Sequence, residues 1–133
     1  MDDLRVEVVY KEHGHISNKN VSESVSFYPE IAWRDEENTK YHYKELMDTL
    51  KKSLRLFNNQ KIYDYEVYLY RAWDKRVFLV RQTWQDKEAG IFELYDYTDS
   101  TSRTANVQKV SRDVVFKRIK SYIDGYLIDN NIL

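Results

Sequence analysis

The first part of the chain alternates between apolar and polar residues, which is the pattern of strands half-buried in a sheet. Residues 4–10 read LRVEVVY and residues 21–28 read VSESVSFY, so each stretch would bury every second side chain. The intervening residues 11–20 contain Gly14 and two asparagines, which indicates a long turn. Pro29 would end the second strand, because proline cannot donate a backbone hydrogen bond to a neighbouring strand.

The period changes to that of a helix over residues 39–57 and again over residues 112–127. In both segments apolar side chains recur every three or four residues and leave the charged side chains to solvent. Thr39 and Ser111 are the candidate N-caps. The first apolar stripe contains Tyr43, Leu46, Met47, Leu50, Leu54 and Phe57, and the second contains Val115, Ile119, Tyr122, Ile123 and Tyr126.

Three further strands are expected between the helices, at residues 62–73, 76–84 and 91–97. Residues 85–90 would turn between the last two strands, and residues 98–110 are polar enough to form a loop. The predicted order is therefore β-β-α-β-β-β-α. This order predicts an α+β fold, a single domain spanning all 133 residues, with an antiparallel sheet of about five strands and two helices packed on one face.

The hairpin formed by the first two of these three strands would have two apolar faces, one against the helices and one left open. On the core face we expect Leu69 to lie opposite Val80 and Tyr65 opposite Trp84. The other face would be rich in tyrosine, which combines a large apolar ring with a hydroxyl that tolerates water. We predict that this second face binds a partner through Tyr68, Tyr70, Leu79, Arg81, Tyr95 and Tyr97.

Two alternatives to a binding face stay open at this point. The first strands or the C-terminal residues 126–133 could cover the second face. The tyrosines could also be scattered and half-exposed without any role in binding, since tyrosine favours strands wherever they occur.

The composition offers little for catalysis or for cofactor binding. The chain has no cysteine, which excludes disulfides and thiolate metal sites, and its three glycines leave no glycine-rich loop for phosphate. His13 and His15 flank a glycine in a predicted turn and lack a third ligand at a fixed spacing. We therefore expect no enzymatic activity, no metal and no cofactor.

Charge is unevenly distributed, although the net charge is only −1. Residues 1–39 carry nine acids and four bases, a net of −5, whereas residues 103–120 carry six bases and one acid, a net of +5. Basic side chains in the second helix are candidates for contact with nucleic acid or with an acidic partner. They are Arg112, Lys117, Arg118 and Lys120.

No apolar run approaches the roughly 20 residues that a membrane span needs. Residues 1–10 also lack the basic start and apolar middle of a signal peptide. We therefore expect a cytoplasmic protein that does not insert into a membrane.

The short, cysteine-free and tyrosine-rich profile is similar to that of small accessory proteins of phages and mobile elements. This resemblance implies a bacterial setting and a non-catalytic protein-binding module, an anti-CRISPR-like or immunity-like inhibitor that occludes a host defence protein. Two other hypotheses stay open. One is a nucleic-acid-binding module that uses the basic helix and the sheet tyrosines, and the other is a virion or structural component that associates with its own copies.

Overall fold

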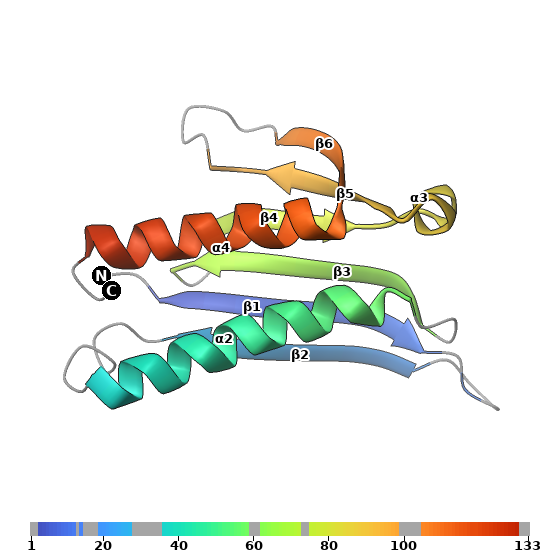
Figure 1. Ribbon diagram of the computed structural model, residues 1–133. Helices are drawn as coiled ribbons and strands as arrows, with labels where there is room; N and C mark the ends of the chain where they lie inside the picture. Colours follow the sequence, from blue (N-terminus) through green and yellow to red (C-terminus); the bar gives the residue numbers. More distant parts are fainter. Residues whose placement is uncertain are drawn as a thin grey trace.

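The computed structural model describes residues 3–12, 14, 19–27, 36–58, 62–72, 75–98 and 105–130 of the chain (Figure 1). Their elements, in chain order, are β1 (Leu4–Glu12), β2 (Lys19–Phe27), α2 (Glu36–Leu56), β3 (Ile62–Arg71), β4 (Lys75–Arg81), α3 (Trp84–Ala89), β5 (Ile91–Asp96), β6 (Asn106–Ser111) and α4 (Arg112–Asp129). The six strands form one sheet in the order β2-β1-β3-β4-β5-β6, and every neighbouring pair is antiparallel. The predicted residues His13, His15 and Pro29 lie outside the described residues.

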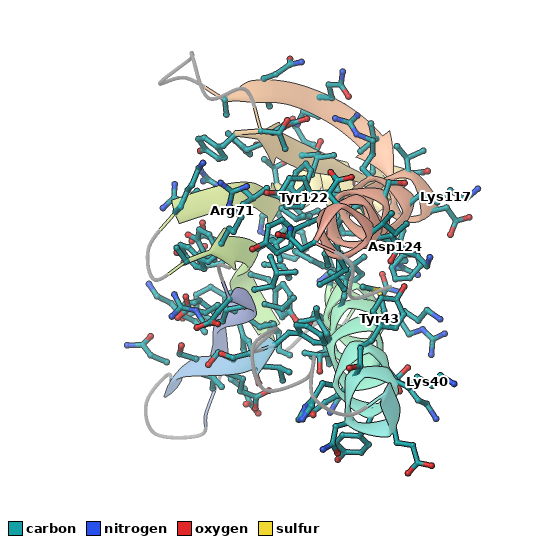
Figure 2. All side chains as sticks on the ribbon, turned by 90° about the vertical axis from the view of Figure 1, so that its left-hand side faces the viewer. Lys40, Tyr43, Arg71, Lys117, Tyr122 and Asp124 are labelled. Carbon is teal, nitrogen blue, oxygen red and sulfur yellow. The ribbon has the colours of Figure 1, made fainter. Side chains whose placement is uncertain are left out.

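Both long helices lie on the same face of the sheet, as Figures 1 and 2 show from two directions. α2 packs against β1, β2 and β3, whereas α4 packs against β5 and β6. Leu50 of α2 and Ile123 of α4 are fully buried, in the same core as Val6 and Val80 of the strands. The predicted α+β class, with an antiparallel sheet covered by helices on one face, is confirmed.

The helix boundaries differ from the prediction at one end. α2 begins at Glu36, three residues before the expected cap. Thr39 therefore lies inside the helix, where it is buried, and its prediction as an N-cap was wrong. For α4 the prediction is confirmed, because the Ser111 side chain accepts a hydrogen bond from the backbone N–H of Val114 at 3.4 Å.

A sixth strand, β6, occupies part of the segment that was expected to be a loop. It pairs with β5 along its whole length, from Ser111 opposite Ile91 to Asn106 opposite Asp96. Most of its side chains are exposed because it forms one edge of the sheet. An edge strand with little buried surface carries only a weak alternation of apolar and polar residues, which explains why the sequence pattern did not reveal it.

The expected end of the β4 strand is instead the start of a short helix, α3. The Thr83 hydroxyl accepts from the backbone N–H of Asp86 at 3.1 Å, and the Asp86 carboxylate accepts from the N–H of Thr83 at 3.3 Å. This reciprocal pair is a capping box, and Gly90, with φ of 68°, ends the helix. Trp84 is consequently 77% exposed, and its predicted place in the core opposite Tyr65 was wrong.

The β3–β4 hairpin is shifted by two residues from the predicted register. Leu69 lies opposite Phe78, not Val80, and a bulge separates this pair from the pair of Tyr70 and Arg76. From Glu66 to Leu69 the shift of two residues leaves the side chains on their original faces, because side chains alternate with a period of two. The predicted division into a core face and a second face therefore survives, except beyond the bulge, which places Arg76 opposite Tyr70.

Candidate protein-binding face

The sheet face opposite the helices is not covered by any helix or strand of the described residues (Figure 2). The alternation of side chains along each strand and the register between neighbouring strands determine which side chains lie on this face. We call it the open face and define it by Arg5, Glu7, Glu66, Tyr68, Tyr70, Arg76, Leu79, Arg81, Glu93, Tyr95, Tyr97 and Lys109. All six residues that were predicted to bind a partner belong to it.

The predicted residues are not equally accessible on the open face. Tyr68, Tyr70, Tyr95 and Tyr97 are half-buried, and Arg81 is exposed. Leu79 lies between Tyr68 and Tyr95 on the neighbouring strands and is only 4% exposed. It therefore supports the rings from below and is not itself available to a partner.

The tyrosine rings are held in place by one another and by arginines. Tyr68 and Tyr70 stack with their ring centres 5.5 Å apart and their planes 18° from parallel. The Arg5 guanidinium lies 4.6 Å from the centre of the Tyr70 ring. Arg76 lies 5.0 Å from the Tyr68 ring and 5.6 Å from the Tyr97 ring, so it bridges β3 to the residue that follows β5.

Two of the tyrosine hydroxyls donate to a glutamate two residues earlier on the same strand. The Tyr68 hydroxyl lies 2.9 Å from Oε2 of Glu66, and the Tyr95 hydroxyl lies 2.7 Å from Oε2 of Glu93. Burial, followed by the bond to the Glu66 carboxylate, raises the pKa of Tyr68 to about 12. The bond to the Glu93 carboxylate similarly raises the pKa of Tyr95. The two hydrogen bonds hold the Tyr68 and Tyr95 side chains in place on the open face.

The acidic and basic side chains of the open face differ in whether they have partners within the molecule. Glu66 and Glu93 accept from the tyrosines, Glu93 also pairs with Lys109 at 2.9 Å, and Glu7 accepts from Ser22 at 3.4 Å. By contrast, the exposed side chains of Arg76 and Arg81 form no ion pair with any carboxylate of the described residues. The face consequently offers guanidinium donors, whereas its own carboxylates are already engaged.

The four basic residues predicted in α4 do not form one binding surface. Arg118 bonds to the Asp96 carboxylate at 2.6 Å and to Gln108 at 3.0 Å, and Lys120 pairs with Asp124 one turn further along the helix. Arg112 lies with its guanidinium 6.0 Å from the Phe92 ring centre. Lys117 alone of the four is exposed without an ion pair to the described residues, and it points away from the sheet (Figure 2).

The sequence pattern did not place Arg76 on the partner-binding face, and it did not reveal Trp84 as an accessible group. Arg76 reaches the open face through the bulge opposite Tyr70, and a bulge cannot be placed from alternation alone. Trp84 had a usable signal, since threonine followed three residues later by an acid is the pattern of a capping box. That pattern at Thr83 and Asp86 would have ended the predicted strand before the tryptophan.

Comparison with protein-family models, with curated proteins and with solved structures found nothing that matches this chain. Within the described residues, no group of three or more histidine, cysteine or acidic side chains is placed to hold a metal ion. No helix in that same part of the chain is both long enough and apolar enough to cross a membrane. The geometry of the open face is therefore the main guide to function.

Proposed function

We propose that this chain is a non-catalytic protein-binding module that docks its open face against an acidic surface of a partner protein. The observation that carries the proposal is the combination of four pre-positioned tyrosines with two exposed arginines that form no ion pair with a carboxylate of the described residues. Tyrosine and arginine are the residues that most often dominate protein interfaces. Rings that are already stacked and hydrogen-bonded lose little conformational entropy on binding.

The open face favours a protein over a nucleic acid as its partner. Three glutamates, Glu7, Glu66 and Glu93, lie among the tyrosines and would repel a phosphate backbone. Three of the four basic residues of α4 are occupied within the molecule, so that helix adds little to phosphate binding. A partner that presents a few carboxylates between apolar side chains fits the mixture better, because each carboxylate can reach Arg76 or Arg81.

The mechanism that we propose is occlusion. A sheet face has no catalytic constellation of its own, but it can cover a partner's functional surface and block it by steric contact. We propose that the chain is an inhibitor encoded by a phage or a mobile element and that its target is a bacterial host protein. In the most specific form of this proposal, the target is a defence enzyme of the host. Inhibition should then be stoichiometric and should follow the affinity of the open face.

The test compares the wild type with the double variant Tyr68→Ala, Tyr70→Ala. Each tagged protein is incubated with lysate of the cells in which the chain occurs, and the retained protein is identified, purified and titrated against both. We expect the double variant to bind the purified partner at least about thirtyfold more weakly. Tyr41→Ala is the matched control, because Tyr41 lies on α2 away from the open face and is 65% exposed.

Three results would contradict the proposal, provided that circular dichroism shows the double variant to be folded. The first is a partner that binds the double variant as tightly as the wild type. The second is retention of a labelled single-stranded oligonucleotide that depends on the two tyrosines and falls steeply with salt, which would indicate a nucleic-acid-binding module. The third is a self-associated species in sedimentation that the double variant dissociates, which would indicate a structural component.

A further inference from the structure

β3 and β4 separate at the end of the sheet that carries α3. Their ladder stops at the pair of Glu66 and Arg81, although β3 reaches back to Ile62. On its other side β3 continues to pair with β1 as far as Glu12 opposite Ile62. β4 ends at Arg81, and the chain turns through Gln82 and Thr83 into α3. We call the space between residues 62–65 and residues 82–84 the fork.

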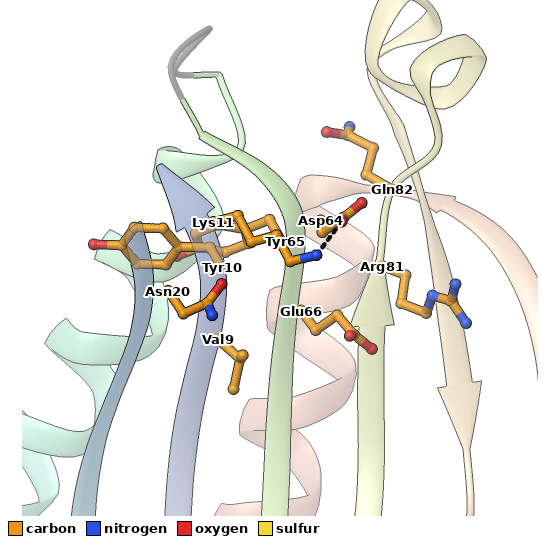
Figure 3. Close-up of a pocket in the computed structure, with 9 residues that line it drawn as sticks. All are labelled: Val9, Tyr10, Lys11, Asn20, Asp64, Tyr65, Glu66, Arg81 and Gln82. Atoms are coloured by element: carbon orange, nitrogen blue, oxygen red, sulfur yellow. Dashed lines mark ion pairs between the residues drawn. The ribbon is translucent and has the colours of Figure 1, made fainter. Parts of the chain in front are cut away.

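Two cavities meet at the fork, and both are lined by Asp64, Tyr65, Arg81 and Gln82. The first has a volume of about 450 Å³ and is shown in Figure 3. Arg81 and Glu66, which are members of the open face, contribute to its lining, so this cavity continues that face. The second has a volume of about 360 Å³ and extends toward α3. The two cavities together give the fork room for several side chains.

The second cavity has an apolar floor and a cationic rim. Phe57 and Ile62 belong to the buried core and form part of its lining. Lys87 and Arg81 line it as well, and the Lys87 ammonium lies 5.7 Å from the centre of the Trp84 ring. Trp84 forms one wall although it is 77% exposed, the highest value among the exposed large apolar side chains of the described residues. An exposed tryptophan beside an apolar floor is the arrangement of a binding anchor.

The charges of the fork indicate what kind of group fits there. The Asp64 carboxylate lies 3.5 Å from the Lys11 ammonium, as the dashed line in Figure 3 shows, and Glu66 accepts from Tyr68. Arg81 contacts the Tyr95 ring at 5.8 Å but has no carboxylate partner among the described residues. Glu66 and Glu93 lie opposite Arg81 on the neighbouring strands but bond to Tyr68, Tyr95 and Lys109, so the Arg81 guanidinium is available to a carboxylate of a partner.

We infer that the fork receives one projecting segment of the partner protein, which places an apolar side chain against Trp84 and a carboxylate on Arg81. The inference rests on the proposed function and extends the contact surface beyond the tyrosines, round the end of β4. The fork can admit such a segment, since residues 62–65 of β3 have no paired strand on this side in the described part of the chain, although Asp64, with φ of 50°, departs from the extended backbone there. Side-chain contacts to Trp84 and Arg81 would then select which segment binds.

The test uses a library of random linear peptides displayed on phage, selected against the intact chain. We expect the enriched peptides to share an acidic residue next to a large apolar one. A synthetic peptide from that set should bind Trp84→Ala and Arg81→Gln about tenfold more weakly than the wild type, or worse. Tyr41→Ala should bind the peptide as the wild type does, because it removes another exposed ring, which lies on α2 and not at the fork.

Nuclear magnetic resonance gives a direct reading at the same site. The indole N–H signal of Trp84, assigned by its disappearance in Trp84→Phe, should shift on addition of the peptide. Trp84 is exposed, so its substitution should leave the fold intact.

Several outcomes would overturn this inference. They are the absence of any enriched sequence, a peptide that binds Trp84→Ala and Arg81→Gln as tightly as the wild type, and an unmoved Trp84 signal at saturation. Failure of the inference about the fork can be distinguished from failure of the proposed function. A protein partner that is lost with the two tyrosine substitutions but retained by Trp84→Ala would leave the open face as the binding site and remove only the fork.

Discussion

Ala72, which directly follows β3, adopts a left-handed backbone conformation with φ of 59°. Its N–H donates to the carbonyl of Asp3 at 2.9 Å and so ties the β3–β4 connection to the residue before β1. A side chain with a Cβ is strained in this conformation, whereas glycine adopts it readily. The strain persists because the bulge and the pairing of β3 on both sides fix the backbone here.

We therefore predict that Ala72→Gly keeps or raises the free energy of unfolding, by up to about 1 kcal/mol. Ala72→Val should lower it by about 1–2 kcal/mol, because a β-branched side chain fits this conformation still less well. Urea denaturation followed by circular dichroism measures both. A less stable glycine variant would show that Ala72 is not strained in the folded protein.

At the scale of elements, α3 is held to the sheet by a cluster of opposite charges. The Lys109 ammonium of β6 lies 2.7 Å from Oδ2 of Asp86 in α3 and 2.9 Å from Oε1 of Glu93 in β5. Hydrogen bonding to Lys109 lowers the pKa of both carboxyl groups. Since these pKa values are lower in the folded state, the cluster stabilises the fold at neutral pH, and this contribution is lost as pH falls through the lowered values.

We predict that Lys109→Met lowers the urea midpoint at neutral pH, because two carboxylates then repel each other without a cation between them. The difference from the wild type should shrink below about pH 4, where the carboxyl groups become protonated. Lys117→Met is the control, because Lys117 has no ion pair with the described residues. A difference that does not change with pH would show that Lys109 acts through packing alone.

The elements that the sequence pattern predicted well are those with one buried side. α4 and the strands β1, β3 and β4 each present an apolar row to the core, and their periods of two or about 3.6 are therefore visible in the sequence. β6 is exposed along an edge, and α3 has one buried residue, Asp86, so neither has an apolar period. The composition of the open face was predictable for the same reason, apart from Arg76, since a two-residue error in register does not move a side chain to the other face. The burial of Leu79 was not predictable from the sequence, because it depends on how the neighbouring tyrosine rings pack over it.

At the scale of the whole molecule, the acidic excess of residues 1–39 does not lie on the sheet. β1 and β2 together carry three acids and three bases, so their charges cancel. The open face itself has four basic side chains, Arg5, Arg76, Arg81 and Lys109, against the three acidic ones Glu7, Glu66 and Glu93. A basic excess on the contact face attracts an acidic partner before contact.

This arrangement predicts that salt changes the rate of association more than the rate of dissociation. Raising the ionic strength from about 0.05 to 0.5 M should slow association with the acidic partner, since the Debye length falls from about 14 Å to about 4 Å and the attraction is screened. Stopped-flow or biosensor measurements separate the two rates. A dissociation rate that carries most of the salt effect would contradict long-range attraction by the open face and would point to ion pairs at the centre of the contact.

The place of β3 between β1 and β4 also governs how the chain assembles during synthesis. The hairpin of β1 and β2 leaves the ribosome first, with α2 next, and the strand that must complete its ladder comes only after both. Until then one edge of β1 stays open to any chain that can pair with it. Contacts between residues so distant in sequence slow folding, so the nascent protein should depend on chaperones most strongly in the interval before β3 emerges.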